Sequence, residues 1–581
     1  MPVRKSPETD AGRPGFAPSP IRYLWSMTPQ RLLKELQRWG FEPSSDDLAG
    51  TSTSTLDPSL LDDLTRALAG AVGGDFASTE EQGARISLAL DAVHNAADLK
   101  RTAPEWVQRL PAFDGEVILD GEPIERAAWD YGKVRHRTPA AVLRPAHAVD
   151  VARAVRFCRR EGIGLSPRGF AHSAGGQMQV HGGLVLDMKS MQRVLAMEDN
   201  WIEVEAGAGW DVVLSAAMDK GRTPPIVTDW LKVSVGGTIS MGGFGFMSFW
   251  RGTQMDHLLE LEVVTGTGEI VCCSAERNPD LFGAVKGTHG KFGIITKARI
   301  PLEQAPESVR LVQACYADLG DMYRDFERHA LGRSTDLIHA FAAERTRGSI
   351  VTRMNSTEAL DVEPAAVDRL LEDGSSRWVY NLELVDFIGG PHGDRHPPVS
   401  TAELHCAEGL VDAWEMDWKS FCFRVPPLVL EEQFRGAAPH PELCAWVPMT
   451  TEGLALLEAE FNRMDPARDV GNGPVLFFPL RTDKVNAPFF RLPASEHCLF
   501  WGLLRRAEPA SHDRIAQLMG DNETLFSRIR EIGGARYLPD TPPDTRAFWT
   551  AHFGEQWGEI QAARERWDQD RVFASSFGNF S

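Results

Sequence analysis

The chain has 581 residues, of which 43% are hydrophobic and 24% are charged, and its formal net charge is −20. This length predicts two or three domains with sizeable cores, and the composition is ordinary for a globular protein. The acidic balance argues against nucleic acid and anionic membranes as partners, because both are bound by clustered lysine and arginine. We therefore expect a small-molecule partner.

The N-terminal residues have no apolar run of the kind that a signal peptide or a membrane span requires. We therefore expect a cytoplasmic protein with no membrane association. The eight cysteines show no CxxC spacing, which favours free buried thiols over a disulfide framework. The same scatter signals no zinc site, and we expect no metal.

Residues 1–20 are rich in proline and glycine and predict a disordered tail. Residues 21–105 predict a helical N-terminal extension, in which Thr28 and Pro29 begin the first helix and Gly40 ends it. No chemistry is evident in this extension. We interpret it as a packing or docking unit.

Short strands and helices alternate in the next part of the chain. The pattern predicts strands at Ala141–Leu143, Gly164–Ser166 and Leu184–Met188, with a helix near Asp150–Glu161. Glycine-rich loops follow these strands, which indicates an α/β or α+β domain whose backbone approaches a ligand closely. Beyond about residue 304 the glycine density falls, and a second, substrate-facing domain is expected.

Two glycine-rich loops carry the candidate chemistry. The first has the sequence RGFAHSAGGQ, and small residues surround His172 directly after a predicted strand, so that backbone amides can approach a phosphate while the imidazole faces the ligand. The second, Ser234–Gly243, follows Asp229. Neither loop matches the Rossmann or the P-loop pattern, which leaves a nicotinamide dehydrogenase or an NTPase poorly supported.

These residues resemble the FAD-linked oxidases of the vanillyl-alcohol oxidase and p-cresol methylhydroxylase (PCMH) superfamily, and within it the cytokinin dehydrogenases. The family signature R-G-x-G-H-S-x-x-G-Q appears as RGFAHSAGGQ, and the similarity continues through TDWLKVSVGGTIS, LLELEVVTGTGEIVCCS and GKFGIITKARI. The resemblance implies an α+β fold: a two-subdomain PCMH-type FAD-binding domain over 106–303, and an α+β substrate domain with an antiparallel sheet over 304–534. It also implies a C-terminal return to the FAD domain over 535–581.

The resemblance further assigns roles to individual residues. His172 falls at the position of covalent FAD attachment. Asp229 falls at that of the catalytic aspartate, which accepts a hydrogen bond from the substrate N–H while the neighbouring carbon gives its hydride to the flavin. Asp229 could instead cap a turn. The implied FAD contacts are Arg168, Gly169, Phe170, Ala171, Ser173, Gln177, Asp229, Ser234, Gly236, Gly237, Thr238, Ser240, Ile294 and Tyr537.

The chain departs from the family pattern at several positions. Ala171 replaces the second glycine of the signature, and Glu442 replaces the tryptophan of a His-Pro-Trp motif, which makes Glu442 a candidate substrate contact. Residues 574–577 replace an S-P-G-Q segment that contacts FAD in the family. Lys232 stands where the berberine-bridge branch has a second attachment cysteine, so attachment through histidine alone is expected.

The leading hypothesis is an FAD-dependent oxidase or dehydrogenase that oxidises a secondary amine such as a cytokinin, with oxygen or a quinone as electron acceptor. The first alternative is oxidation of an alcohol, a sugar or a natural-product intermediate by the same hydride transfer. A flavin-binding protein without catalytic activity is the least favoured hypothesis. The sequence leaves the oligomeric state open.

Overall fold

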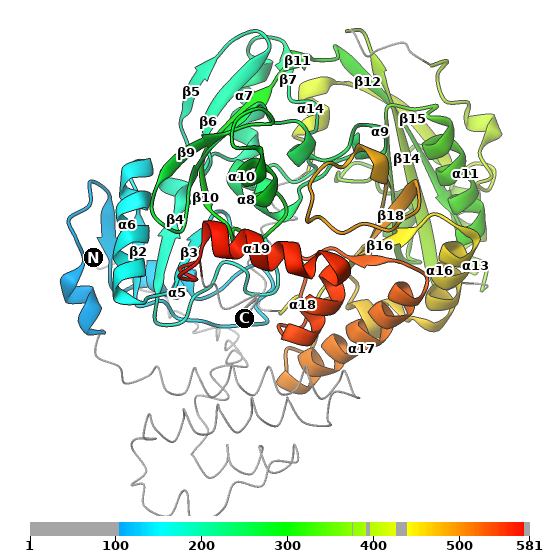
Figure 1. Ribbon diagram of the computed structural model, residues 1–581. Helices are drawn as coiled ribbons and strands as arrows, with labels where there is room; N and C mark the ends of the chain where they lie inside the picture. The colour runs from blue at the N-terminus through cyan, green and yellow to red at the C-terminus, as the bar shows by residue number, and fades with distance from the viewer. Residues whose placement is uncertain (1–103, 375, 391–395, 426–437, 574–581) are drawn as a thin grey trace, which may run out of the picture.

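The computed structural model describes residues 104–573, except 375, 391–395 and 426–437, as a mixed arrangement of helices and sheets (Figure 1). The predicted tail 1–20, nearly all of the predicted extension 21–105 and the segment 574–577 lie outside the described residues. Within the described part, two smaller sheets lie on one side of the molecule, and a large eight-stranded sheet lies on the other.

The first sheet has the order β1-β2-β4-β3, in which β2 and β3 both run parallel to β4. The three predicted strands and the helix between the first two are confirmed, and this helix begins two residues earlier than predicted. The strands are β1 (Glu116–Ile118), β2 (Ala141–Arg144), β3 (Leu165–Arg168) and β4 (Leu184–Asp187), and the helices are α5 (Glu122–Ala127) and α6 (Ala148–Glu161).

The second sheet is antiparallel, with the order β5-β6-β10-β8-β9, and a two-stranded ribbon of β11 and β7 lies beside it. Its strands are β5 (Val194–Met197), β6 (Trp201–Glu205), β8 (Glu260–Val264), β9 (Ile270–Cys273) and β10 (Ile294–Pro301), and the ribbon strands are β7 (Arg222–Thr223) and β11 (Glu303–Gln304). The associated helices are α7 (Trp210–Met218), α8 (Val235–Met241), α9 (Ser248–Arg251) and α10 (Pro279–Ala284).

The large sheet is antiparallel throughout, with the order β15-β12-β14-β13-β17-β18-β16-β19. Its strands are β12 (Ser308–Tyr316), β13 (Leu337–Glu344), β14 (Trp378–Ile388), β15 (Val411–Asp417), β16 (Leu443–Pro448), β17 (Val475–Arg481), β18 (His497–Leu503) and β19 (Ala535–Arg536). The helices are α11 (Leu319–Gly332), α12 (Arg347–Val351), α13 (Pro364–Glu372), α14 (Trp418–Cys422), α16 (Thr451–Arg463) and α17 (His512–Glu531). The antiparallel sheet expected for the second domain is thereby confirmed.

The two faces of the large sheet contact different parts of the molecule, because successive side chains of a strand point to opposite faces. Ile338 and Ala340 of β13 pack in a core with side chains of α11, α16 and α17. Leu337 packs in another core that includes Phe246 and Ile239 from the side of the smaller sheets. The inner face of the large sheet therefore borders the second glycine-rich loop.

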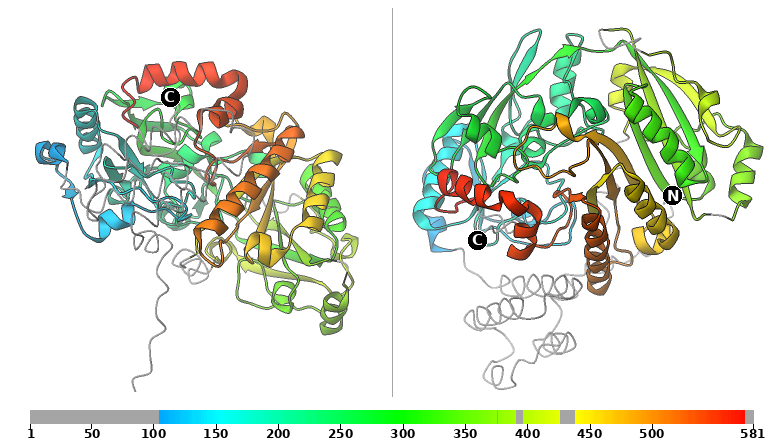
Figure 2. Two further views of the ribbon diagram at one scale, coloured as in Figure 1. Left: turned by 90° about the horizontal axis from the view of Figure 1, so that it is seen from below. Right: turned by 45° about the vertical axis from the view of Figure 1, so that its right-hand side comes forward.

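The C-terminal part crosses from the large sheet back to the smaller ones. After β19, α18 (Arg546–Phe553) and α19 (Trp557–Trp567) run across the molecule (Figure 2). The carbonyl of Val572 then accepts a hydrogen bond from the N–H of Leu165 in the first sheet.

The eight cysteines form no disulfide, and six of them are buried. In the described ranges, no helix combines the length and the apolarity that a membrane crossing requires.

Candidate functional site

A cavity of about 170 Å³ lies where the two glycine-rich loops meet. The structure brings thirteen of the predicted site residues to its lining: Gly169, Phe170, Ala171, His172, Ser173, Gln177, Ser234, Gly236, Gly237, Thr238, Ser240, Ile294 and Tyr537. Arg168, Asp229 and Glu442 lie outside this lining. Sequence reasoning missed His289 and the glycines at 290 and 293, which line the cavity from the loop before β10.

The glycines of the two loops allow the loops to pack against their neighbours. A Cβ atom on Gly169 would lie 2.1 Å from Oγ of Ser234, and a Cβ on Gly236 would lie 2.9 Å from Cβ of Ala206. Among the described residues, those that line the cavity include no Asp, Glu, Lys or Arg. A phosphate group in this cavity would therefore meet backbone amides and hydroxyl groups rather than charged side chains.

Several predicted FAD contacts also hold the loops in place. The side-chain amide of Gln177 donates hydrogen bonds of 2.8 Å to the carbonyls of Leu538 and Asp540, which joins the first loop to the C-terminal part. The hydroxyl of Ser234 accepts the N–H of Gly237 and caps α8.

The aromatic and basic members of the predicted set are anchored as well. The hydroxyl of Tyr537 donates to the carbonyl of Gly242. Arg168 is buried and donates to the carbonyls of Trp129 and Arg126, so that it supports the first loop from behind the cavity.

His172 faces the cavity. The residue is exposed only toward the cavity that it lines, and the protein packed around its imidazole keeps water away from the ring. Its ring centroid lies 5.1 Å from that of Tyr131, which in turn stacks on His440 at 4.6 Å. Burial, and to a smaller degree the charge of His440, lower the pKa of His172 to about 4. The imidazole is therefore neutral at pH 7 and keeps a nitrogen lone pair that can form a covalent bond.

Ala171 adopts a left-handed backbone conformation, with φ of 59°. This conformation explains why the family signature has glycine here, since a Cβ atom disfavours positive φ. Replacing Ala171 with glycine is expected to stabilise the protein by roughly 1 kcal/mol and to raise its Tm. Thermal unfolding of the FAD-loaded protein measures this change.

Ala174 provides the matched control for that substitution. It is buried in the same loop and has no positive φ, so Ala174→Gly is expected to lower the Tm. A lower Tm for Ala171→Gly as well would contradict the assignment of strain to position 171.

Asp229 lies near the cavity, in the loop that leads to α8. The ring of the next residue, Trp230, is 6.4 Å from the ring of His172. Burial raises the pKa of Asp229 to about 6, while the charges of His339 and Arg424 oppose that rise. Above pH 6 the side chain is therefore mainly a carboxylate, which can accept a hydrogen bond and stabilise a nearby positive charge.

An aromatic cluster, which sequence reasoning missed, borders this region. Phe244 follows the second loop, and its ring centroid lies 4.9 to 5.6 Å from those of Trp446, Phe478, Phe500 and Tyr537. The first three come from β16, β17 and β18 of the large sheet. Because these residues are far apart in the sequence, only the pairing of the strands reveals the cluster. Of these rings, Tyr537 lines the cavity, and the others pack behind it and support that side of the site.

Glu442 is buried behind Tyr131 rather than in the lining of the cavity. Burial raises its pKa to about 8, and the side-chain hydrogen bond with Tyr131 only partly offsets this rise. At pH 7 the side chain is therefore mainly protonated, as expected for a buried carboxyl group beside which the described residues place no cation.

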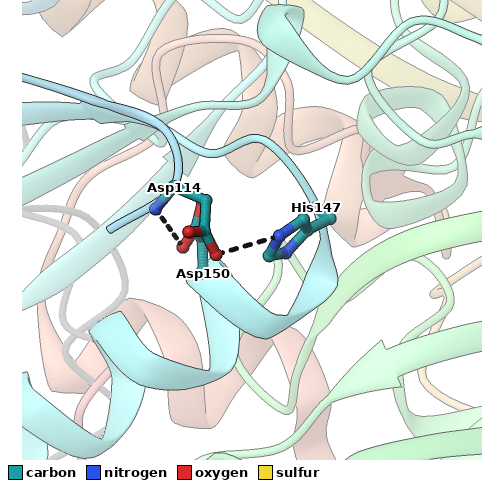
Figure 3. A group of neighbouring side chains, drawn as sticks. All are labelled: Asp114, His147 and Asp150. Carbon is teal, nitrogen blue, oxygen red and sulfur yellow. Dashed lines mark hydrogen bonds and ion pairs between the residues drawn. The ribbon is translucent and has the colours of Figure 1, made fainter. Parts of the chain in front are cut away.

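A further group of potential metal ligands lies away from the cavity. Asp114, His147 and Asp150 approach one another at the start of α6 (Figure 3). Both carboxylate oxygens of Asp150 accept backbone N–H groups, from Asp114, Gly115 and Ala146. His147 forms a half-exposed ion pair with Asp114. These contacts explain Asp150 as a cap that holds the chain at the start of the helix.

Comparison with known proteins adds independent evidence. Residues 139–274 match the family described as FAD binding domain, and residues 306–580 match the one described as Cytokinin dehydrogenase 1, FAD and cytokinin binding.

Three relatives illustrate the similarity. An uncharacterized oxidoreductase, ORF5 in the fasciation locus of Rhodococcoides fascians, is 30% identical over 79% of this chain and 97% of its own length. Cytokinin dehydrogenase 5 of Oryza sativa subsp. japonica is 32% identical over 80% of this chain and 91% of its own length. Cytokinin dehydrogenase 1 of Arabidopsis thaliana is 27% identical over 81% of this chain and 85% of its own length.

Proposed function

This chain belongs to the cytokinin dehydrogenase family of FAD-dependent oxidases and dehydrogenases, and we propose that it takes a hydride from a secondary amine, such as a cytokinin, with FAD bonded covalently to His172. In this proposal residues 106–303 hold the cofactor, residues 304–534 provide most of the substrate site, and residues 535–581 complete the cofactor site. The electron acceptor is oxygen or a quinone. A cytoplasmic location stays a prediction.

One observation carries the proposal: a neutral imidazole faces a cavity between two amide-rich loops, with a buried carboxylate and a buried aromatic cluster nearby. His172 contributes the imidazole, and Gly169 and Gly236 allow the close approach of the backbone. Uncharged loops of this kind suit the pyrophosphate and ribityl parts of FAD. The residues therefore fit FAD, which when bound supplies the hydride acceptor.

Asp229 is the residue we propose to assist the chemistry. Its carboxylate accepts a hydrogen bond from the substrate N–H and orients the adjacent carbon. As the hydride leaves that carbon, positive charge develops on the nitrogen, and a fixed anion stabilises it. The aromatic cluster around Phe244 excludes water and strengthens this electrostatic interaction.

Substrate-dependent bleaching of the flavin under anaerobic conditions tests the proposed reaction. We expect isopentenyladenine to reduce the bound FAD, which removes its yellow absorbance, and we expect alcohols and sugars to leave it unchanged. Bleaching by alcohols or sugars alone would support the alternative substrate class. A flavin that no candidate reduces would indicate a protein without catalytic activity. Readmission of oxygen, or addition of a quinone, then identifies the electron acceptor by the rate at which colour returns.

A further inference from the structure

A buried charged triad lies on the inner face of the large sheet, close to the loop that holds Asp229. The ring of Phe246 packs against that of His339 and shares a core with Val227 and Leu231, which flank Asp229 in the chain. The charges of the triad act on the Asp229 carboxyl group across this contact. His339 of β13 and Glu383 of β14 are directly paired across the two strands. Nε2 of His339 lies 2.8 Å from Oε1 of Glu383. Arg424, just after α14, donates to both carboxylate oxygens of Glu383 in a bidentate pair.

The triad lies in apolar surroundings. The ring of His339 packs edge-on against Phe246 at 4.5 Å, and the guanidinium of Arg424 lies over the ring of Phe421 at 4.3 Å. The side chains of His339 and Glu383 are 2% and 0% exposed. Transferring charges into such surroundings is costly, and replacement by apolar residues would often stabilise a protein. Fold stability alone therefore does not explain the triad.

Two atoms of the triad are not satisfied within the described structure. Nδ1 of His339 and Nε of Arg424 are buried and have no hydrogen-bond partner among the described residues. Unsatisfied buried polar atoms are rare in folded proteins and often occur at functional sites. Burial opposes the ionisation of Glu383, but the charges of Arg424 and His339 outweigh it and lower the pKa of Glu383 to about 2. Glu383 is thus an anion that partly neutralises Arg424.

We propose that His339, Glu383 and Arg424 form a positioning triad that sets the charge of Asp229, with Arg424 favouring the carboxylate and Glu383 opposing it. Other charged groups are less well placed for this role. Lys232, on the same loop as Asp229, is exposed and pairs with Asp211. His172, which contacts Trp230, is neutral at pH 7. The proposal rests on the proposed function, because the charge of Asp229 matters only if that carboxylate acts on the substrate.

Infrared titration of the FAD-loaded protein tests the proposal without any substrate. The signal is the infrared absorption band of a protonated carboxyl group. The band is assigned to Asp229 because it is absent from the Asp229→Asn variant. In the unmodified protein we expect a titration midpoint near pH 6. Arg424→Gln removes a favourable cation and should raise the midpoint by about one unit, whereas Glu383→Gln leaves Arg424 unneutralised and should lower it by about one unit.

Two further variants separate a positioning role from general damage to the fold. Arg424→Lys keeps the positive charge, so it should keep the midpoint near that of the unmodified protein. Glu460→Gln removes a buried carboxylate that pairs with Arg463 and Arg528 away from the site, and it should leave the midpoint unchanged. Each variant is compared only after the flavin absorbance confirms that FAD is bound.

Opposite shifts in Arg424→Gln and Glu383→Gln would support the triad. Shifts in one direction, or no shift, would overturn it. The proposal would also be overturned if the unmodified protein showed no infrared band of a protonated Asp229 at any pH tested. Asp229 would then be ionised throughout, and no triad would be needed to set its charge. None of these results depends on whether isopentenyladenine bleaches the flavin, so failure of the triad and failure of the proposed reaction are distinguishable.

Discussion

Replacement of His172 by alanine is expected to yield a protein that loses all of its FAD on acid denaturation. In the unmodified protein the flavin should stay with the acid-precipitated chain, and the intact mass should exceed that of the polypeptide by one FAD. The reason is that His172 is a neutral imidazole facing the cavity, and a neutral nitrogen is the nucleophilic form. Intact-mass spectrometry and the colour of the precipitate measure the result.

A second histidine of the same cavity provides the matched control. His289 also lines the cavity, and burial lowers its pKa to about 3, so that it too is neutral. His289→Ala is expected to keep the covalent flavin. If the unmodified protein carries no added mass, or if His289→Ala rather than His172→Ala loses it, the proposed attachment site is wrong.

Asp229→Asn is expected to slow the reduction of the flavin by isopentenyladenine by about 10²- to 10⁴-fold, the usual contribution of a positioned acid–base group. Asparagine retains the size of the side chain but lacks the negative charge that stabilises the developing cation. Stopped-flow measurement of flavin bleaching under anaerobic conditions gives the rate. FAD content should be unchanged, because Asp229 lies outside the lining of the cofactor cavity.

The rate of flavin reduction should also depend on pH, in a direction set by the pKa of Asp229. Burial raises the pKa of Asp229 to about 6, so the active carboxylate is lost as the pH falls through 6. The rate in the unmodified protein should therefore fall below pH 6, and this acidic limb should be absent from Asp229→Asn.

A carboxyl group elsewhere on the large sheet is the control for Asp229→Asn. Asp386 of β14 is buried, has a raised pKa and accepts the N–H of Val399. Asp386→Asn should leave both the rate and its pH profile unchanged. Equal rates for Asp229→Asn and the unmodified protein would show that Asp229 only caps the turn before the second loop.

The first loop shows how much of the site a local sequence motif can predict. The RGFAHSAGGQ segment identified His172 and the surrounding loop, because a short signature depends on spacing along the chain. It also identified Ala171 as a departure from the glycine of the signature. The structure adds the reason, which is the positive φ at that residue.

Glu442 shows the limit of the same approach. Its alignment with a tryptophan suggested a substrate contact, which stays a prediction, and the structure buries it beside Tyr131, outside the lining of the cavity. Sequence alignment places Glu442 directly before β16, but the direction of its side chain depends on the neighbouring segments. The outcome for the residues before 104 stays open, since they lie outside the described part of the chain.

The sequence by itself determined three strands of the first sheet, the helix between the first two of them, the two glycine-rich loops and thirteen residues that line the cavity. These features depend on local periodicity, on backbone freedom at glycine and on short spacings. Only the tertiary structure decided that Phe244 meets β16, β17 and β18, and that His339, Glu383 and Arg424 meet near Asp229. Such contacts join residues up to hundreds of positions apart, and strand pairing in the large sheet, rather than any local pattern, brings them together.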